Sequence, residues 1–459
     1  MAAPKHLLFP VESPETRLDC RLALAVESAR PDNRVYIGRH EVLMHLARRL
    51  KGGVFLGNTA VAPPHNGADG TSKQPFDDYH LLKDRGFVVV HFDFETPPGD
   101  PDSARNSATD RNFDPRQLDG DDFVCTWGDL HRDVYTRLDP PCRSSIRTTG
   151  GPHFDLYRHK WHKLYEDDVR RLRADYGDFL LVTTRLFRAN GRADDTDLFD
   201  GDDRRRRNGR FEAVQRWTRE KKKLSYVARL VHRLQTVFPD IDVVIRPHRL
   251  EDPSLYRILF RGLPSVHVRR RGPLAPWILG ARCLIHDGSE SGLAAHLADT
   301  PLIHFCPLED SPLETMLPRQ FGVRCDHEDD VVECLVELLH ADGHRTCFDD
   351  PTIIDHRARR LVDNLCGDAF PAMLSVLAEA QARVGDTAMM PKIAVDAEQK
   401  LFDLVGRLKK SAPVVGSRTN SPGSGFDDVS SRLRQLQQLT DRDVDHHLIG
   451  DRLLVVESP

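Results

Sequence analysis

The sequence predicts an α/β protein with two Rossmann-like domains, each built around a parallel sheet, and a helical C-terminal extension. Short apolar runs alternate with segments of helical periodicity along most of the 459 residues, which is the pattern of doubly wound sheets. In the second half of the chain, two polar segments, at 246–251 and 286–292, directly follow apolar strands. Ligands of open α/β sheets bind at such strand ends. The length suffices for two such domains and additional segments.

The first domain is expected at 1–172. Period-2 and continuous apolar runs predict its strands, and apolar residues at helical spacing predict the helices between them. The first four expected strands lie at 5–9, 34–38, 52–57 and 87–95, and the first three expected helices at 18–30, 40–50 and 76–86. A further strand is expected before Trp127, with a helix after it, and another strand before the turn at Gly150. Residues 96–120 are rich in turn formers and are expected to form a loop. A helix at 161–177 is expected to lead out of this domain.

The second domain is expected at 173–350. It begins with a strand at 178–187, and a long amphipathic helix at 210–238 is expected to cover its sheet. A helical extension follows at 351–410, and 411–459 is expected to be a linker and tail, partly disordered.

The turn His286–Gly292 is the first candidate site. It joins a strand at 283–285 to a short helix at 293–297, with a second strand at 301–305, so both strands must run parallel. Gly288 and Gly292 allow close approach to backbone N–H groups, and Ser289 and Ser291 add hydroxyl groups. Such a turn suits a phosphate. The alternative is an ordinary capped turn without a ligand.

The second candidate site follows the strand that begins at residue 241. Pro247 cannot donate to a sheet ladder, so the strand ends there and presents His248 beside Arg246. An imidazole and a guanidinium are suitable partners for a monophosphate or diphosphate. The alternative is that His248 is a polar residue satisfied within the protein.

Asp93 and Glu95 are candidate catalytic acids. They end the most apolar strand of the first domain and, two residues apart on an extended segment, share one face. A carboxylate at a strand's carboxyl end can act as a general base. The alternative is that both acids lie in a solvated loop.

Composition limits the classes of function. A net charge of -5 gives no indication of nucleic-acid binding, and no apolar run approaches the roughly 18 residues that cross a bilayer. Nine cysteines without metal-ligand spacing predict a reduced cytosolic compartment and no structural zinc. Asp102, Asp119 and Asp121 lie in loop-like sequence, so we predict neither a metal nor a cofactor.

Four motifs resemble those of the bacterial surface carbohydrate biosynthesis family, in the same order. They are WG at 127–128, TGGPHFDLYR at 149–158, RPHRLE at 246–251 and HDGSESG at 286–292. The segments VESPETRLD at 11–19 and DFE at 93–95 are similar to the family's N-terminal signatures. The resemblance covers roughly residues 5–345. It implies a GT-B glycosyltransferase whose two domains face a cleft.

The resemblance also implies an activity and a set of site residues. The activity is transfer of a sugar from a nucleotide-activated donor to a surface polysaccharide or lipopolysaccharide acceptor, and a similarity to CMP-sugar transferases suggests a CMP-linked donor. Asp93 or Glu95 would act on the acceptor hydroxyl, and the acceptor side would include Glu12, Arg17 and Asp155. The nucleotide-binding residues would be Arg246, His248, Glu251, His286, Asp287, Gly288, Ser289, Ser291 and Gly292. The expected location is cytoplasmic, with peripheral contact to the inner membrane face as a further option.

Three departures from the family pattern leave the nucleotide and the activity open. Arg249 replaces the second proline of an RPHP-type motif, His153 replaces an arginine, and Ala294 stands where an acidic residue is usual. One alternative is a nucleotide-sugar epimerase of the same fold. The other is a catalytically silent binding or scaffold protein of a polysaccharide assembly system.

Overall fold

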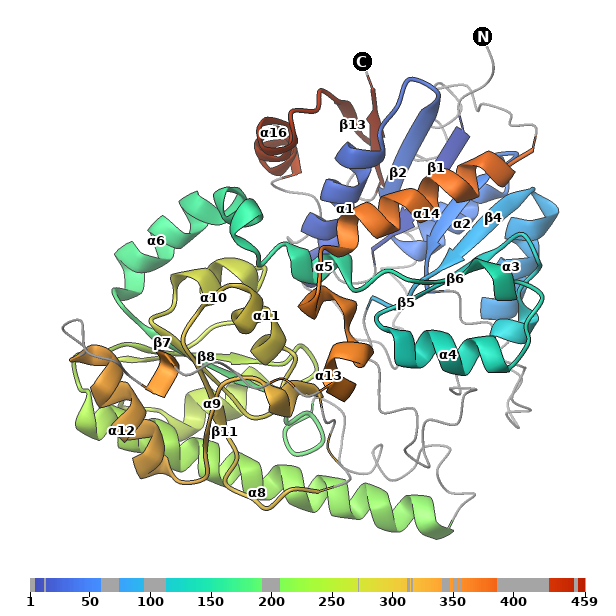
Figure 1. Cartoon of the computed structure of the whole chain (residues 1–459). Coiled ribbons are helices and arrows are strands. Elements are labelled where there is room, and N and C mark those ends of the chain that lie inside the picture. The colour runs from blue at the N-terminus through green and yellow to red at the C-terminus, as the bar shows by residue number, and fades with distance from the viewer. Residues whose placement is uncertain are drawn as a thin grey trace, which may run out of the picture. The chain divides into compact units, whose positions relative to one another are not determined.

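The computed structural model divides the chain into two compact units (Figure 1). Unit 1 combines Met1–Leu156 with Arg359–Pro459, and unit 2 is Tyr157–Ala358. The residues described are 5–11, 14–58, 74–94, 113–191, 207–270, 272–311, 314, 317–340, 347–349, 354, 356–385, 429–449 and 453–458. The chain therefore leaves unit 1, forms unit 2 and returns.

Unit 1 contains an eight-stranded sheet in the order β13-β14-β2-β1-β3-β4-β5-β6. Six strands pair in parallel. The two C-terminal strands pair antiparallel to each other, and β14 also pairs antiparallel to β2. The strands are β1 (Lys5–Pro10), β2 (Asn33–Gly38), β3 (Gly53–Gly57), β4 (Phe87–His91), β5 (Phe123–Thr126), β6 (Ile146–Thr148), β13 (Asp445–Ile449) and β14 (Leu453–Glu457).

Helices cover both faces of this sheet. One face carries α2 and α3, whose buried Leu43, Leu46 and Leu82 share a core with Phe55 and Val89 of the strands. Across the other face runs α14, which contacts β3, β4 and β5 (Figure 1). The helices are α1 (Pro14–Ser28), α2 (His40–Ala47), α3 (Gln74–Asp84), α4 (Asp129–Arg137), α5 (Pro152–Asp155), α13 (His356–Leu361), α14 (Ala369–Arg383) and α16 (Val429–Thr440).

The C-terminal segment differs from its prediction. We predicted a linker and tail over 411–459, but 445–449 and 453–457 form two antiparallel strands of the sheet, with Leu454 opposite Ile37 of β2. The reason is apolar burial: Leu454 and Val456 are fully buried, and the run LLVVE is a strand pattern that we did not recognise. Residues 411–428, and the part of the predicted helical extension at 386–410, lie outside the described residues.

Unit 2 contains a six-stranded, entirely parallel sheet in the order β12-β11-β10-β7-β8-β9. Its strands are β7 (Leu180–Thr184), β8 (Val243–Pro247), β9 (Val266–Val268), β10 (Cys283–His286), β11 (Leu302–Phe305) and β12 (Val323–Cys325). Two parallel sheets in one chain confirm the predicted class, α/β with two Rossmann-like domains. That the domains face one cleft stays a prediction.

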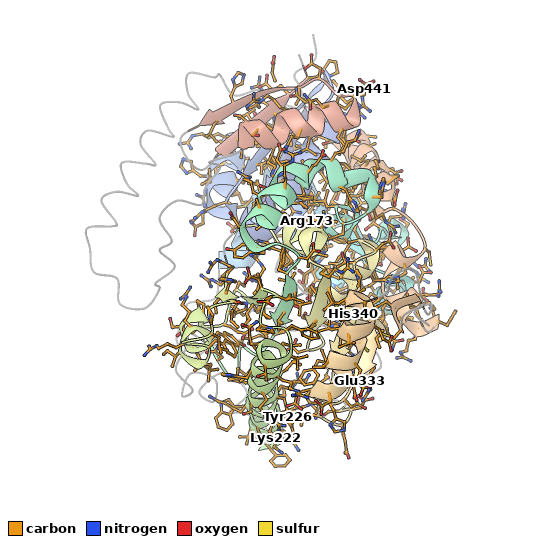
Figure 2. The ribbon with its side chains drawn as sticks, turned by 90° about the vertical axis from the view of Figure 1, so that its left-hand side faces the viewer. Arg173, Lys222, Tyr226, Glu333, His340 and Asp441 are labelled. Carbon is orange, nitrogen blue, oxygen red and sulfur yellow. The ribbon has the colours of Figure 1, made fainter. Side chains whose placement is uncertain are left out.

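The helices of unit 2 also cover both faces of the sheet. Those described are α6 (Glu166–Tyr176), α8 (Arg207–Val237), α9 (Pro253–Leu259), α10 (Ala275–Gly280), α11 (Ser291–Leu297) and α12 (Glu328–Leu339). Ion pairs link α8 to α12, with Arg229 to Glu328 at 2.9 Å, and Figure 2 labels Lys222 and Tyr226 on α8 beside Glu333 on α12. No helix in the described part of the chain is long and apolar enough to cross a bilayer.

The first domain was expected to extend to residue 172, but the structure divides the chain between Leu156 and Tyr157. The helix α6 packs on α10, and Arg173 Nε donates to the Gly280 carbonyl at 3.3 Å. These contacts explain why 157–172 lies with unit 2.

A substitution pair tests the role of the two C-terminal strands. Because Leu454 is fully buried, we expect Leu454→Ala to lower the free energy of unfolding by about 2–5 kcal/mol. Its register partner Leu448 is 49% exposed, so Leu448→Ala should change it by less than about 0.5 kcal/mol. Urea unfolding of both variants measures this. Equal losses would contradict the place of these strands in the core.

Candidate functional site

The two motifs of the second half meet at one edge of the unit 2 sheet. The central strand β7 pairs with β8 on one side and β10 on the other, with Thr184 opposite Pro247 and Thr183 opposite His286. The turns that follow β8 and β10 therefore flank the end of β7, about 10 Å or two strand spacings apart. This is the carboxyl edge, where open α/β sheets bind ligands.

Three buried hydroxyl groups gather at the β10–α11 turn. Thr183 Oγ1 shares hydrogen bonds with Ser291 Oγ at 2.6 Å and with Ser289 Oγ at 3.3 Å, and the two serines also bond each other. Gly292 is required here, because a Cβ would lie 2.7 Å from the His286 ring. The turn therefore presents three hydroxyl groups in a closely packed setting.

Glu251 ties the ends of two strands together. Its fully buried carboxylate accepts from Tyr256 Oη at 2.6 Å, from Thr184 Oγ1 at 3.0 Å, and from the backbone N–H groups of Leu186 and His248. Burial raises the pKa of Glu251 to about 7. These contacts fix the loops after β7 and β8, so a positioning role is the one that the geometry supports.

His248 stands at the end of β8 as a neutral imidazole. Burial, with Arg185 and Arg249 nearby, lowers its pKa to about 4. Its Nδ1 accepts from the Leu250 N–H at 3.3 Å, which leaves the proton on Nε2. Within the described residues, Nε2 has no hydrogen-bond partner. His248 can therefore donate one neutral hydrogen bond to a ligand, whereas it lacks the positive charge of an imidazolium at neutral pH.

Arg246 has an internal role in this structure. The buried guanidinium lies 5.0 Å from the centroid of the Trp277 ring and donates to the carbonyls of Gly272, at 2.9 Å, and Arg270. These bonds hold the loop after β9.

His286 and His304 form a neutral stacked pair, with ring centroids 4.9 Å apart. His286 Nε2 bonds the Phe321 carbonyl at 3.0 Å, and its Nδ1 accepts from the Gly288 N–H at 3.2 Å. Burial lowers the pKa of His286 to about 4 and that of His304 to about 2. His286 therefore orders the turn and carries no charge.

Asp287 has one carboxylate oxygen without a partner. Its Oδ2 accepts from the Arg185 N–H at 3.0 Å, and its backbone carbonyl accepts from Lys223 Nζ at 2.9 Å. Its Oδ1 is buried and has no hydrogen-bond partner among the described residues. Burial also raises the pKa of Asp287. Buried polar atoms without a protein partner are rare, and such an oxygen can accept a hydrogen bond from water or from a ligand.

A basic pocket opens beside Asp287. Its basic residues are Arg185, Arg188, Arg216, Arg219, Lys223 and Arg319. We did not predict these residues from the sequence. The signal that could have revealed them is the spacing of 216, 219 and 223, which places three basic side chains on one face of the long helix α8.

The structure describes Asp93 but not Glu95. Asp93 lies two residues beyond β4, and its backbone carbonyl accepts from Trp127 Nε1 at 2.8 Å. The next residue, Phe94, is buried with the Arg21 guanidinium 3.3 Å from its ring centroid. Glu95 and Glu12, and the side chain of Arg17, lie outside the described residues. Their predicted roles stay predictions.

Asp155 holds the returning C-terminal segment. Its buried carboxylate accepts from Asn364 Nδ2 at 2.7 Å and from the Phe370 N–H at 2.9 Å. Burial raises the pKa of Asp155 to about 6. Asn364 also bonds the backbone of Gly151, and a side chain at Gly128 would clash with the Arg360 backbone. The WG and TGG motifs therefore contact the chain where it re-enters unit 1.

The acidic group Asp119, Asp121 and Asp122 contains a lysine. Their carboxylates approach one another within 4.8 Å, but Lys83 Nζ lies 2.9 Å from Asp121 and 2.8 Å from Asp122. The ammonium group of Lys83 thus offsets part of the negative charge of these three acids.

No protein-family model and no curated protein matches the sequence. Among solved structures, the chain is similar to UDP-GlcNAc 2-epimerase from Neisseria meningitidis, with 10% identity, a TM-score of 0.47, and coverage of 82% of this chain and 100% of that one. It is also similar to UDP-N-acetylglucosamine 2-epimerase from Rickettsia bellii, with 10% identity, a TM-score of 0.45, and coverage of 83% of this chain and 97% of that one. For the wall teichoic acid polymerase TagF, the identity is 10%, the TM-score 0.44, and the coverage 83% of this chain and 90% of that one.

The Glu251 carboxyl predicts a pH dependence of stability. Because its folded-state pKa is raised from 4.5 to about 7, its contribution is complete below pH 4.5 and is lost as the pH rises through 7. The loss should total about 3 kcal/mol. In Glu251→Gln, the amide oxygen can accept both backbone N–H bonds while the amide nitrogen donates to the two hydroxyls. This variant should lack that decline in urea unfolding between pH 5 and 8. An unchanged slope would contradict the assignment.

Proposed function

We propose that the protein is a GT-B glycosyltransferase that transfers a sugar from a nucleotide-activated donor to a surface polysaccharide or glycolipid acceptor. The observation that carries this proposal is the grouping of hydrogen-bonding groups at the carboxyl edge of the unit 2 sheet. The Thr183–Ser289–Ser291 hydroxyl cluster and the available His248 Nε2 follow neighbouring strands there. The motif resemblance in the sequence supports the same function.

The nucleotide phosphate is the group that this edge would bind. Hydroxyl groups and a neutral N–H can donate to phosphate oxygens without adding charge, and the arginines of the adjoining pocket supply the charge. The hydroxyls now satisfy one another, so a phosphate would replace those bonds. CMP is the nucleotide that we propose first, because of the resemblance to CMP-sugar transferases.

In the proposed reaction, a carboxylate of Asp93 or Glu95 removes the proton of the acceptor hydroxyl. The oxygen then forms a bond to the anomeric carbon while the bond from that carbon to the donor phosphate breaks. The bonding electrons leave with the nucleotide phosphate, whose added charge the unit 2 donors stabilise. We propose a cytoplasmic location, with the acceptor presented at the inner face of the membrane.

The test begins with calorimetric titration of CMP, UDP, GDP and CDP, and continues with product analysis for each nucleotide sugar that binds. Sugar joined to an added acceptor supports transfer. Free nucleotide with an epimerised sugar, formed without an acceptor, would identify the epimerase alternative. The absence of both binding and turnover would favour the silent scaffold.

One prediction of this proposal concerns nucleotide affinity. His248→Ala should weaken nucleotide binding by roughly 1–3 kcal/mol through the lost hydrogen bond. Because the pKa of His248 is about 4, this residue stays neutral between pH 6 and 8. It should therefore cause no pH dependence of the wild-type nucleotide affinity in that range. His340→Ala, at an exposed histidine after α12 (Figure 2), is the control. Equal affinities for both variants would exclude His248 as a ligand.

Another prediction of this proposal concerns catalysis. Asp93→Asn and Glu95→Gln preserve shape and remove charge, so loss of the true base should lower turnover by about 10²–10⁴-fold. Nucleotide affinity should stay nearly constant. Transfer rates with an authentic donor and acceptor measure this, and we expect the larger loss for Glu95→Gln. Full activity in both variants would disprove the catalytic assignment.

A further inference from the structure

The basic pocket of unit 2 lies on the α8 side of the candidate site. Four consecutive residues after β7, 185–188, form one wall, and the second wall is one face of α8. Asp287 and Gly288 close the pocket at the end of β10, and Glu314 and Arg319 complete the lining. All of these segments belong to unit 2.

The pocket contains more positive than negative side chains. Its lining includes six basic residues and three acidic ones, Glu220, Asp287 and Glu314. Two of the acids hold basic side chains in place. Glu220 pairs with Arg188 at 3.0 Å, and Glu314 pairs with Arg219 at 3.0 Å and with Lys223. The basic groups are thus positioned before any ligand binds, which favours recognition of an anion.

Two other arginines of the pocket are also held by acids, and these acids lie outside the pocket lining. Arg216 pairs with Glu212 at 3.1 Å, and Arg319 pairs with Asp310. Neither Glu212 nor Asp310 lines the pocket. A guanidinium has five donors in a planar fork, so one arginine can bind a carboxylate and a second oxygen acceptor at the same time.

The partnerless oxygen of Asp287 adds a second requirement. Asp287 is only 6% exposed, lines the pocket, and its buried Oδ1 accepts no hydrogen bond from the described residues. A bare anion would leave that oxygen unsatisfied and would be repelled by it if the carboxyl is ionised. A ligand hydroxyl would satisfy it.

We propose that this pocket binds the phosphorylated sugar or polyol end of the donor. The phosphate contacts the arginines of α8 and of the loop after β7, and an adjacent hydroxyl donates to Asp287 Oδ1. This inference rests on the proposed function, and it identifies the part of the donor that the pocket of unit 2 recognises. The pocket then selects the donor by the hydroxyl groups that lie next to the phosphate at the non-nucleotide end.

The experiment compares three probes by calorimetry on the full chain: glucose 1-phosphate, inorganic phosphate and glucose. Glucose 1-phosphate should bind roughly tenfold or more tightly than phosphate, since it alone supplies both a phosphate and hydroxyls. Glucose should not bind measurably. The affinity of both anions should fall as salt is raised from about 0.05 to 0.5 M, because exposed parts of the ion pairs are screened.

Variants distinguish the two contacts. Arg216→Gln should weaken both anions about tenfold or more through the loss of one charge-assisted contact. Asp287→Asn should instead lower the ratio of the glucose 1-phosphate affinity to the phosphate affinity toward one. Lys222→Gln is the matched control, because it removes the same charge from an exposed position on the same helix, outside the pocket lining (Figure 2). It should change both affinities less than about twofold.

Two outcomes would overturn the inference. The first is equal effects of Arg216→Gln and Lys222→Gln, which would mean general charge attraction. The second is equal affinity of the wild-type protein for glucose 1-phosphate and phosphate. Parallel titration with nucleotides separates this inference from the proposed function. Pocket binding without nucleotide binding or transfer would refute only the proposed function, and nucleotide binding without pocket binding would refute only the inference.

Discussion

The buried carboxylate of Glu251 is the interaction on which the candidate site depends. Four donor groups converge on its two oxygens, and they come from β7, from the loops after β7 and β8, and from α9. This arrangement fixes the positions of His248 and of the loop after β7. The neighbouring strand β10 is held to the same edge by the hydroxyl contacts of Thr183. Removing one donor would cost about 1–3 kcal/mol for the lost hydrogen bond, although each oxygen would keep at least one other donor. The geometry of the pocket walls therefore follows from a few interior hydrogen bonds.

Charge at this edge comes from arginine and lysine rather than from histidine. Burial keeps His248, His286 and His304 neutral at ordinary pH, whereas guanidinium groups stay charged throughout the physiological range. The histidines thus contribute shape and directed hydrogen bonds, and the arginines contribute the electrostatic attraction. A phosphate-binding site built in this way would keep its charge over the pH range in which a histidine-based site would lose it.

The sequence predicted the strands and the parallel sheets well because continuous apolar runs such as 87–90 and 243–245 indicate burial on both faces of a sheet. It also placed the turns of 246–251 and 286–292 at strand ends, where the structure has them. The roles of individual residues within those turns could not be predicted from the sequence. Whether Arg246 faces a ligand or Trp277 depends on packing between elements that are distant along the chain. The arginines of α8 were missed for a similar reason, since helical spacing shows that they share a face but not what that face covers. The strands at 445–449 and 453–457 were missed because they complete a sheet begun by the first strands.

The return of the chain to unit 1 has a consequence for synthesis on the ribosome. The strand β2 pairs with β1 on one side and with β14 on the other, yet β14 is translated only after all of unit 2. During that interval β2 would be an edge strand, with backbone N–H and C=O groups open to pairing with another chain. The nascent protein therefore passes through a stage in which its second domain can fold while its first remains incomplete and prone to aggregation. Chaperone dependence, expression yield and sensitivity to C-terminal truncation would all follow from the position of these last strands.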